Sequence, residues 1–431
     1  MKSCPKCQRT YPNDAGFCPV EGTPLVFTSM VPVAASSDDK RIGTRLVGRY
    51  EVRRVVADGG MGRVYEGVDK QTDSRIAVKV LHDDVAQDDV ARERFRREYE
   101  ISANLPHDYI VSVTDFQRDP ELGVWILVME YLDGEELRFV LKREKVLPPA
   151  RLIRMLSQVA MGLDEAHSKQ FVHRDLKPDN VFLCGTREGD VVKLLDFGSV
   201  KDKNKDAKKL TVLGTTIGSP YYMAPEQAQG LDTLDARADV FALAAITYEC
   251  LTGRVPFDGT NGPSILLAIL TKDPTPPTHA GKGGPFPIPP ALDDVLEEAL
   301  AKNANIRTRS VGALADAVGH AYGLTGDHRE WAKVPVADLT TRCAEALPRV
   351  MAPRPAAAVV QADPFASPSA GGAPPMSAGA GMQQAFEVAR QAELGAAGVP
   401  PARPPWVLAV IVGVAALVLG GGLALVLVLA N

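Results

Sequence analysis

Residues 173–180 read His-Arg-Asp-Leu-Lys-Pro-Asp-Asn, residues 196–198 read Asp-Phe-Gly, and residues 224–226 read Ala-Pro-Glu. The first two stretches bring carboxylate, amide and ammonium side chains together in a short part of the chain. Carboxylate and amide oxygens are ligands that Mg2+ accepts, and ammonium groups neutralise phosphate charge. Phosphoryl transfer needs phosphates held still, their charge neutralised and a hydroxyl aimed in line. The three stretches, in this order, indicate a site for that chemistry.

Two features upstream fit the same chemistry. Residues 56–64, Val-Ala-Asp-Gly-Gly-Met-Gly-Arg-Val, predict a glycine-rich turn between two strands, where backbone N–H groups can approach phosphate oxygens. Lys79 ends the apolar run Ile-Ala-Val-Lys, where its charge is costly unless it meets an anion. Alone, the turn is an ordinary hairpin and the lysine could extend to solvent. Glu98, on a predicted helix, supplies the partner that favours a phosphate site.

These residues resemble the eukaryotic-type (Hanks-type) protein kinase family from about Tyr50 to about Tyr322. The sequence of the glycine-rich turn looks most like that of the bacterial members. The resemblance implies an α+β, bilobal fold, with a small β-rich lobe and a large helical lobe. It also implies a serine/threonine protein kinase that transfers the γ-phosphate of ATP to protein hydroxyls, its own included. Leu-Lys-Pro-x-Asn in the loop favours serine and threonine over tyrosine as acceptor.

The resemblance assigns roles to individual side chains. Asp175 is the base for the acceptor hydroxyl, and Lys177 is a cation near the γ-phosphate. Lys79 holds the α- and β-phosphates with Glu98 fixing its position, while Asn180 and Asp196 chelate Mg2+. The implied ATP-binding residues, with Met129 as gatekeeper, are Val56, Ala57, Gly59, Gly60, Gly62, Val64, Ala77, Lys79, Met129, Glu130 and Leu132.

Other positions have structural or regulatory roles by the same resemblance. Glu226 should pair with Arg307, and Asp239 should hold the backbone of the catalytic loop. Arg174 is available to bind a phosphorylated activation loop. The candidate phosphosites are Thr211, Thr215 and Thr216, each of which could equally be an unmodified loop threonine.

Ala57 departs from the family pattern, because it stands where the first glycine of the phosphate loop is expected. Its methyl group removes the option of a positive φ at the loop entrance. Gly59 and Gly62 remain. We expect natural tolerance, or at worst a reduced affinity for the nucleotide.

The N-terminal residues 1–27 resemble a zinc ribbon. Cys4 and Cys7 form one Cys-x-x-Cys turn, Cys18 begins a second, and Glu21 stands where a ribbon has its fourth cysteine. A carboxylate binds zinc, although a structural site prefers thiolate. The alternatives are a redox pair with a spare thiol or a degenerate ribbon. No aromatic and basic surface indicates nucleic acid as a partner.

The C-terminal part predicts a membrane anchor. The apolar residues 407–430 would make a helix of roughly 36 Å, enough to cross a hydrocarbon core of about 30 Å. The alternative is a buried soluble helix. Arg403 before the span favours a cytoplasmic kinase domain on a single-pass membrane protein. Ala416, Gly420 and Ala424 form a small-residue ridge that could pair two such helices, as a homodimer for trans-autophosphorylation would use.

Composition adds few constraints. The 48 basic and 53 acidic residues give a net charge of −5, so no bulk attraction to nucleic acid or acidic lipid follows. The six cysteines are not spaced as in a secreted disulfide scaffold. The predicted organisation is a ribbon-like module at 1–27, a linker at 28–48, a kinase domain at 49–322, a helical extension at 323–347, an Ala/Pro-rich linker at 348–405 and a transmembrane helix at 406–430. Patterning predicts strands at 50–56, 63–68, 75–81 and 125–129, and helices at 90–105, 149–169, 235–252 and 291–302.

A pseudokinase that serves only as a scaffold is the competing class of function. The complete set of Lys79, Glu98, Asp175, Asn180 and Asp196 argues against it. A third possibility makes the N-terminal module the main binding part, with the kinase as its switch. The sequence does not name protein substrates, because they depend on surfaces outside the catalytic residues.

Overall fold

The computed structural model describes residues 39–59, 62–197, 220–231 and 234–352, together with the short strands 2–3, 10–11 and 26–27. Several predictions lie outside these residues: the ligands Cys4, Cys7, Cys18 and Glu21, the turn residue Gly60, the candidate phosphosites Thr211, Thr215 and Thr216, and the membrane helix 406–430. Within the described part, no helix has the length and apolar character to cross a membrane, and no cluster of His, Cys, Asp and Glu could hold a metal ion. The short strands β1 (Lys2–Ser3), β2 (Thr10–Tyr11) and β3 (Val26–Phe27) form one antiparallel sheet, in the order β2-β1-β3.

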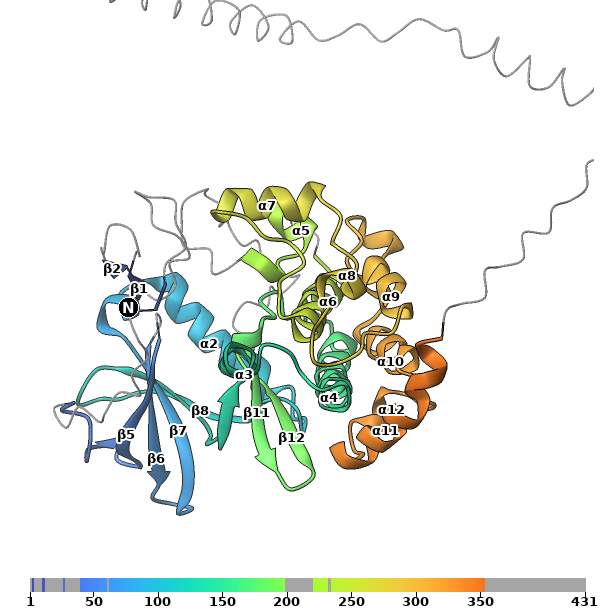
Figure 1. Ribbon diagram of the computed structural model, residues 1–431. Coiled ribbons are helices and arrows are strands. Elements are labelled where there is room, and N and C mark those ends of the chain that lie inside the picture. Colours follow the sequence, from blue (N-terminus) through green and yellow to red (C-terminus); the bar gives the residue numbers. More distant parts are fainter. Residues whose placement is uncertain are drawn as a thin grey trace, which may run out of the picture. The chain divides into compact units, whose positions relative to one another are not determined.

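The small lobe is an antiparallel sheet of six strands with one long helix (Figure 1). Its elements are β4 (Arg45–Leu46), β5 (Tyr50–Asp58), β6 (Gly62–Asp69), β7 (Ser74–Leu81), α1 (Asp83–Ala86), α2 (Asp89–Ala103), β8 (Val113–Arg118) and β9 (Trp125–Glu130). The strand order is β4-β5-β6-β7-β9-β8. All four predicted strands and the predicted helix in this region are present, whereas β4 and β8 were not predicted.

The sheet has apolar side chains on both faces. In β9, Ile126 and Val128 pack in one buried cluster, and Leu127 packs in a second cluster with Phe95 of α2. Successive side chains of a strand point to opposite faces, so both faces of the sheet are covered. Lys79 pairs with Leu127 in register and its ammonium lies 5.5 Å from the Phe95 ring, so this lysine faces α2.

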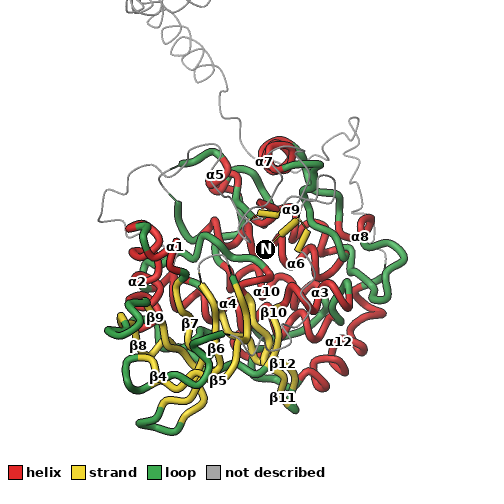
Figure 2. Tube along the Cα trace, turned by 90° about the vertical axis from the view of Figure 1, so that its left-hand side faces the viewer, coloured by secondary structure: helices red, strands yellow, loops and turns green. Residues whose placement is uncertain are grey.

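The large lobe is mostly helical (Figure 2). Its elements are β10 (Gly134–Glu136), α3 (Leu137–Glu144), α4 (Pro149–Ser168), η1 (Pro178–Asn180), β11 (Val181–Thr186), β12 (Gly189–Leu194), η3 (Pro220–Tyr222), α5 (Pro225–Ala228), α6 (Arg237–Thr252), α7 (Gly262–Thr271), α8 (Pro277–Ala280), α9 (Ala291–Ala299), η4 (Ala304–Ile306) and α10 (Val311–Ala321). Helix α6 is buried on nearly all sides, as its run of apolar residues requires. The hairpin β11-β12, with β10 beside it, carries the catalytic loop at one end.

Residues 39–48 pack on the small lobe, although the sequence assigns them to a linker. Strand β4 pairs with β5, the Gly43 amide donates to the Val52 carbonyl (2.8 Å), and Leu46 is fully buried. The polar composition of this segment gave no indication that it belongs to the fold. It packs there through backbone pairing with a strand and through one buried leucine. The fold therefore begins before Arg49.

The predicted C-terminal extension is present as α11 (His328–Trp331) and α12 (Val336–Val350). Trp331 is fully buried, and a Cβ on Gly319 would lie 2.1 Å from its ring, so only glycine fits there. His328 contacts Asp316 (Nδ1 to Oδ1 2.8 Å) and Asp164 (Nε2 to Oδ2 3.5 Å). These two carboxylates, Asp164 above all, raise the pKa of His328 against the opposing effect of burial. The extension is therefore an integral part of the large lobe.

Candidate active site

Lys79 and Glu98 form the ion pair that the sequence predicts. The Lys79 Nζ lies 2.9 Å from Oε2 and 3.2 Å from Oε1 of Glu98, and both side chains are largely buried. Burial would lower the pKa of Lys79, but the Glu98 and Asp196 carboxylates outweigh it and raise that pKa above its ordinary value. Lys79 is therefore a fixed cation on the face of the small-lobe sheet that α2 covers, and Glu98 of α2 orients it.

The catalytic loop brings three predicted residues together. The Lys177 Nζ donates to Asp175 Oδ2 at 2.7 Å, and the Asn180 amide donates to the Asp175 carbonyl at 2.7 Å. Burial would lower the pKa of Lys177, but Asp175 outweighs it and raises that pKa. A carboxylate thus lies beside an ammonium cation, an arrangement that suits transfer of a charged phosphoryl group to a hydroxyl.

Asp239 holds this loop from below, as predicted. Its carboxylate accepts the backbone N–H groups of His173 (2.8 Å) and Arg174 (2.9 Å) and contacts the His167 ring nitrogen at 2.8 Å. Asp239 is fully buried on α6. Burial would raise its pKa, but His167 above all, together with His173 and the Arg174 amide, outweighs burial and holds that pKa below its usual value. The loop is thereby fixed to the most buried helix of the fold.

Asp196 lies next to the catalytic loop. The Leu195 amide donates to the Asn180 carbonyl at 3.0 Å, and a His173 ring nitrogen contacts the Leu195 carbonyl at 3.0 Å. The buried Phe197 ring lies 4.8 Å from the His173 ring. Asp196 has φ of 59°, a left-handed conformation that a non-glycine residue adopts only where its surroundings fix it. The metal-ligand candidates Asn180 and Asp196 are therefore held side by side through their backbones.

The glycine-rich turn joins β5 to β6. Ala57 pairs with Val64 inside an extended strand, so the position has no need of a positive φ and alanine fits without strain. Gly62 is expected to let the backbone approach phosphate, and the structure adds a reason for glycine here: a Cβ would lie 2.3 Å from the Val80 carbonyl oxygen. The close approach of β6 to β7 thus selects glycine at this position, apart from any phosphate.

The predicted adenine-binding residues lie along β5, β6, β7 and β9. Ala77 pairs with Met129 in register, and Val64 pairs with Lys79, so these residues share one end of the sheet. Glu130, one of the implied ATP-binding residues, also has side-chain partners: it forms an ion pair with Lys193 (2.8 Å) and accepts the Ser112 amide (2.8 Å). Val56 is exposed, while Met129, Glu130 and Leu132 are partly buried.

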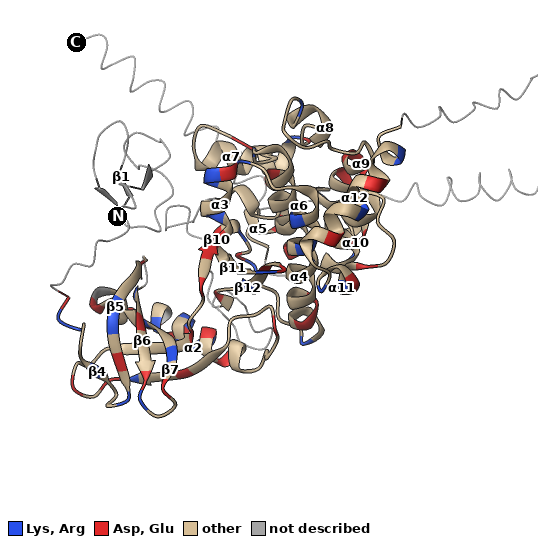
Figure 3. Cartoon of the chain, turned by 60° about the horizontal axis from the view of Figure 1, so that its bottom comes forward, with Lys and Arg blue, Asp and Glu red and all other residues tan. Residues whose placement is uncertain are grey.

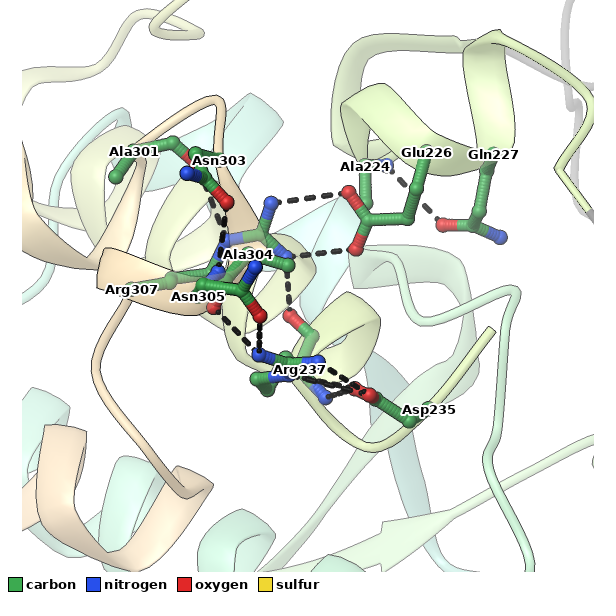
Figure 4. A network of polar contacts seen from close by, with 10 residues as sticks. All are labelled: Ala224, Glu226, Gln227, Asp235, Arg237, Ala301, Asn303, Ala304, Asn305 and Arg307. Carbon is green, nitrogen blue, oxygen red and sulfur yellow. Dashed lines mark hydrogen bonds and ion pairs between the residues drawn. The ribbon is translucent and has the colours of Figure 1, made fainter. Parts of the chain in front are cut away.

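Glu226 and Arg307 form the predicted buried pair (Figure 4). The Arg307 guanidinium donates to both carboxylate oxygens of Glu226, at 2.7 and 3.0 Å, and also to the carbonyls of Arg237 and Ala301. The Arg307 side chain is completely buried. This bidentate pair fixes α5, which begins within the Ala-Pro-Glu stretch, against α6 and η4.

The comparisons with known proteins match this geometry. The sequence model of the protein kinase domain matches residues 50–321. The chain belongs to the protein kinase family. Among the curated kinases it resembles the serine/threonine-protein kinase PknA of Mycobacterium tuberculosis, with 40% identity over 281 residues, and pkn3 of Myxococcus xanthus, with 36% identity over 278 residues. The match covers 64% of this chain in both cases, but only 62% of PknA and 50% of pkn3.

The solved structures give the same result for the fold. A crystal structure of the PknI kinase domain of Mycobacterium tuberculosis has 31% sequence identity and a TM-score of 0.51, covering 65% of this chain and 98% of that one. The expectation of a bilobal kinase fold is thereby confirmed. The kinase domain also explains the order of the motifs in the sequence.

One residue of the kinase site was not predicted. Arg138 of α3 contacts Asp179 of the catalytic loop (3.3 Å), Glu249 of α6 (3.1 Å) and the Tyr222 hydroxyl (2.7 Å), and Tyr222 also donates to Glu249. This cluster braces η3, which precedes the Ala-Pro-Glu stretch, against the catalytic loop. Its members are scattered over more than a hundred positions, so no local pattern indicates it.

Arg174 of the kinase has one guanidinium nitrogen that makes no hydrogen bond with the described residues. Its Nε is buried without a hydrogen-bond partner among them, and burial lowers the pKa of its guanidinium. Its backbone has φ of 66° and its carbonyl accepts the side-chain amide of Gln227 at 2.7 Å.

A surface hollow beside α4 and α11 contains none of the predicted site residues. It is lined by His107, Met161, Asp164, Glu165, His328 and Arg329.

Proposed function

We propose that this chain transfers the γ-phosphate of ATP to serine and threonine hydroxyls of proteins. The observation that carries the proposal is the joint placement of Asp175, Lys177 and Asn180 in one loop, anchored on Asp239. The Lys79–Glu98 ion pair supplies the phosphate-holding cation in the other lobe. The curated relatives named as serine/threonine-protein kinases support the same acceptors.

The residues divide the work as follows. Asp175 orients the acceptor hydroxyl and takes its proton as the oxygen attacks the γ-phosphorus. Lys177, held 2.7 Å from Asp175, stabilises the negative charge on the transferring phosphoryl group. Lys79 holds the phosphates that remain on the nucleotide. The backbone amides of the glycine-rich turn can cover those phosphates, and the backbone groups around Glu130 can hydrogen-bond the base.

The chain's own residues fit a magnesium ion. Asn180 uses its side-chain nitrogen toward Asp175, which leaves its oxygen as the atom for a metal, and Asp196 supplies a carboxylate nearby. The Asp196 charge raises the pKa values of both Lys79 and Lys177, so a negative potential lies between the two cations. Oxygen ligands of this kind suit Mg2+, which would neutralise and orient the phosphates when bound.

A transfer assay tests the activity. The full chain, given ATP labelled at the γ-phosphate and a general acceptor protein, should yield phosphoserine and phosphothreonine but no phosphotyrosine. Chelation of divalent cations should abolish the signal, and added Mg2+ should restore it. Background signal from the purified chain with Mg2+ present would count against the proposal.

Autophosphorylation of the activation segment follows from Arg174. We propose that a phosphate on Thr211, Thr215 or Thr216 pairs with this guanidinium, whose Nε has no hydrogen bond among the described residues. Mass spectrometry of the chain after incubation with MgATP identifies the residue. Phosphate at sites elsewhere only would contradict this assignment.

We also propose a membrane-anchored kinase with an N-terminal zinc module. The apolar residues 407–430, with Arg403 before them, support a single span with the kinase domain in the cytoplasm. Cys4, Cys7, Cys18 and Glu21 support zinc. One comparison tests both: the full chain should sediment with membranes and carry one zinc ion, and the fragment 39–352 should do neither. A full chain that stays in the supernatant, or that is free of zinc, removes the corresponding proposal.

A further inference from the structure

Asp39 lies at the entry to the kinase domain, outside the residues that the family model matches. Its side chain is only 4% exposed. Its Oδ2 accepts the Tyr65 hydroxyl (2.7 Å) and a guanidinium nitrogen of Arg63 (2.7 Å), and its Oδ1 accepts the Arg41 amide (3.0 Å). A buried carboxylate with three donors is a built contact and not a chance surface pair.

Arg63 connects this carboxylate to the glycine-rich turn. Its other guanidinium nitrogens donate to Asp58 Oδ2, at 2.6 and 3.0 Å. Asp58 and Arg63 are the last residues that pair in register between β5 and β6 before the turn, and the Gly59 amide donates to the Gly62 carbonyl at 3.0 Å. Arg63 is thus shared between the entry segment and the stem of the turn.

His82 holds the same stem from the neighbouring strand end. One of its ring nitrogens lies 3.0 Å from the Gly59 carbonyl and 3.1 Å from Asp58 Oδ1. Among the described residues, His82, which follows β7, and Asp39, which acts through Arg63, both support the stem. Figure 3 shows basic and acidic residues along β5, β6 and β7.

We propose that Asp39 is a positioning residue for ATP: through Arg63 and Asp58 it sets the stem of the glycine-rich turn, and the entry segment thereby controls nucleotide affinity. A turn that covers phosphates binds them well only if its amides are already oriented. Removing the Asp39 charge frees Arg63 to pair with Asp58 alone, which loosens the turn. Burial alone would raise the pKa of Asp39, but the Arg41 amide, Tyr65 and Arg63 lower it, so the carboxylate is charged at neutral pH.

The test is Asp39→Asn in the full chain. Asparagine keeps the size and can still accept from Tyr65, so the fold should persist. We expect the dissociation constant and KM for ATP to rise about three- to tenfold, with kcat and KM for the protein substrate within about twofold. Arg63→Met should give the same change, and the double variant should be no worse than Arg63→Met alone.

Asp69→Asn is the matched control. Asp69 is the last residue of β6, the strand that carries Arg63, and it lies at the end of β6 opposite the turn. Its side chain is 8% exposed and accepts two hydrogen bonds from Arg49, at 2.8 and 2.6 Å. It should lower the melting temperature as much as Asp39→Asn does and leave ATP affinity unchanged. Equal ATP affinity in Asp39→Asn and the wild type, or equal losses in both variants, would overturn the proposal.

This inference rests on the proposed phosphoryl transfer only for the measurements of kcat and KM. Equilibrium binding of ATP, measured by calorimetry, reports the effect of Asp39 without turnover. A wild-type chain that binds ATP and transfers no phosphate would contradict the proposed function and leave the binding comparison intact. A wild-type chain that transfers phosphate, with an Asp39→Asn variant of unchanged affinity, would contradict the inference alone.

Discussion

Asp175→Asn should lower kcat for phosphoryl transfer by about 10²- to 10⁴-fold. Asparagine keeps the shape of the loop, because the Asn180 amide donates to the backbone carbonyl of residue 175 and not to the carboxylate alone. It cannot take the proton of the acceptor hydroxyl. The ATP affinity should stay within about twofold, since the phosphate-holding pair Lys79–Glu98 is untouched. Steady-state kinetics with labelled ATP measure both quantities.

Asp190→Asn is the control for loss of a carboxylate in the large lobe. Asp190 belongs to β12 and accepts from Arg151 at 2.6 Å, away from the catalytic loop. Its kcat should match that of the wild type. If Asp175→Asn kept the turnover of the wild type, Asp175 would not be the base. The pseudokinase alternative, in which the chain serves only as a scaffold, would then be favoured.

Arg307→Ala should lower the free energy of unfolding by about 3–5 kcal/mol. The Arg307 side chain is completely buried, and Glu226, which would lose both of its hydrogen bonds, is 13% exposed. The carbonyls of Arg237 and Ala301 would also lose their donor. Breaking a buried pair from one side costs more than the pair contributes, because the remaining charge stays in a poorly solvated place. Urea denaturation followed by circular dichroism measures the change.

Arg143→Ala provides the comparison with a surface pair. Arg143 contacts Glu135 at 2.7 Å, as short as the buried contact, but its side chain is 55% exposed. Water and salt screen such a pair, so its loss should leave the denaturation midpoint unchanged. Similar shifts for Arg307→Ala and Arg143→Ala would mean that burial does not set the energetic weight of the pair.

The kinase fold could be predicted from the sequence, and so could the grouping of most of the candidate catalytic residues. The chemistry of phosphate, metal and proton transfer fixes residue types at short spacings, as in residues 173–180, and such spacings are visible in one dimension. The Lys79–Glu98 pair was also predictable, from a lysine inside an apolar run and a glutamate on a nearby predicted helix, and the Glu226–Arg307 pair was predictable through the resemblance to the family. The structure brings each pair together.

Contacts between distant residues without a family motif could not be predicted. The Glu130–Lys193 pair, the Arg138 cluster and the Asp39–Arg63 contact join residues from separate elements. Each is an ordinary charged residue in the sequence, and its partner depends on how strands and helices pack. Residues 39–48 were misassigned to a linker for the same reason: their order comes from pairing with β5 and not from their own composition.

The attachment of the catalytic loop to α6 has a consequence for its motions. Local opening of a protein costs more free energy where more buried structure must separate. The amides of His173 and Arg174 bond to Asp239 in the buried helix α6, so the loop can leave its place only when both bonds break. We therefore expect this loop to open less often than segments that are held only at the surface.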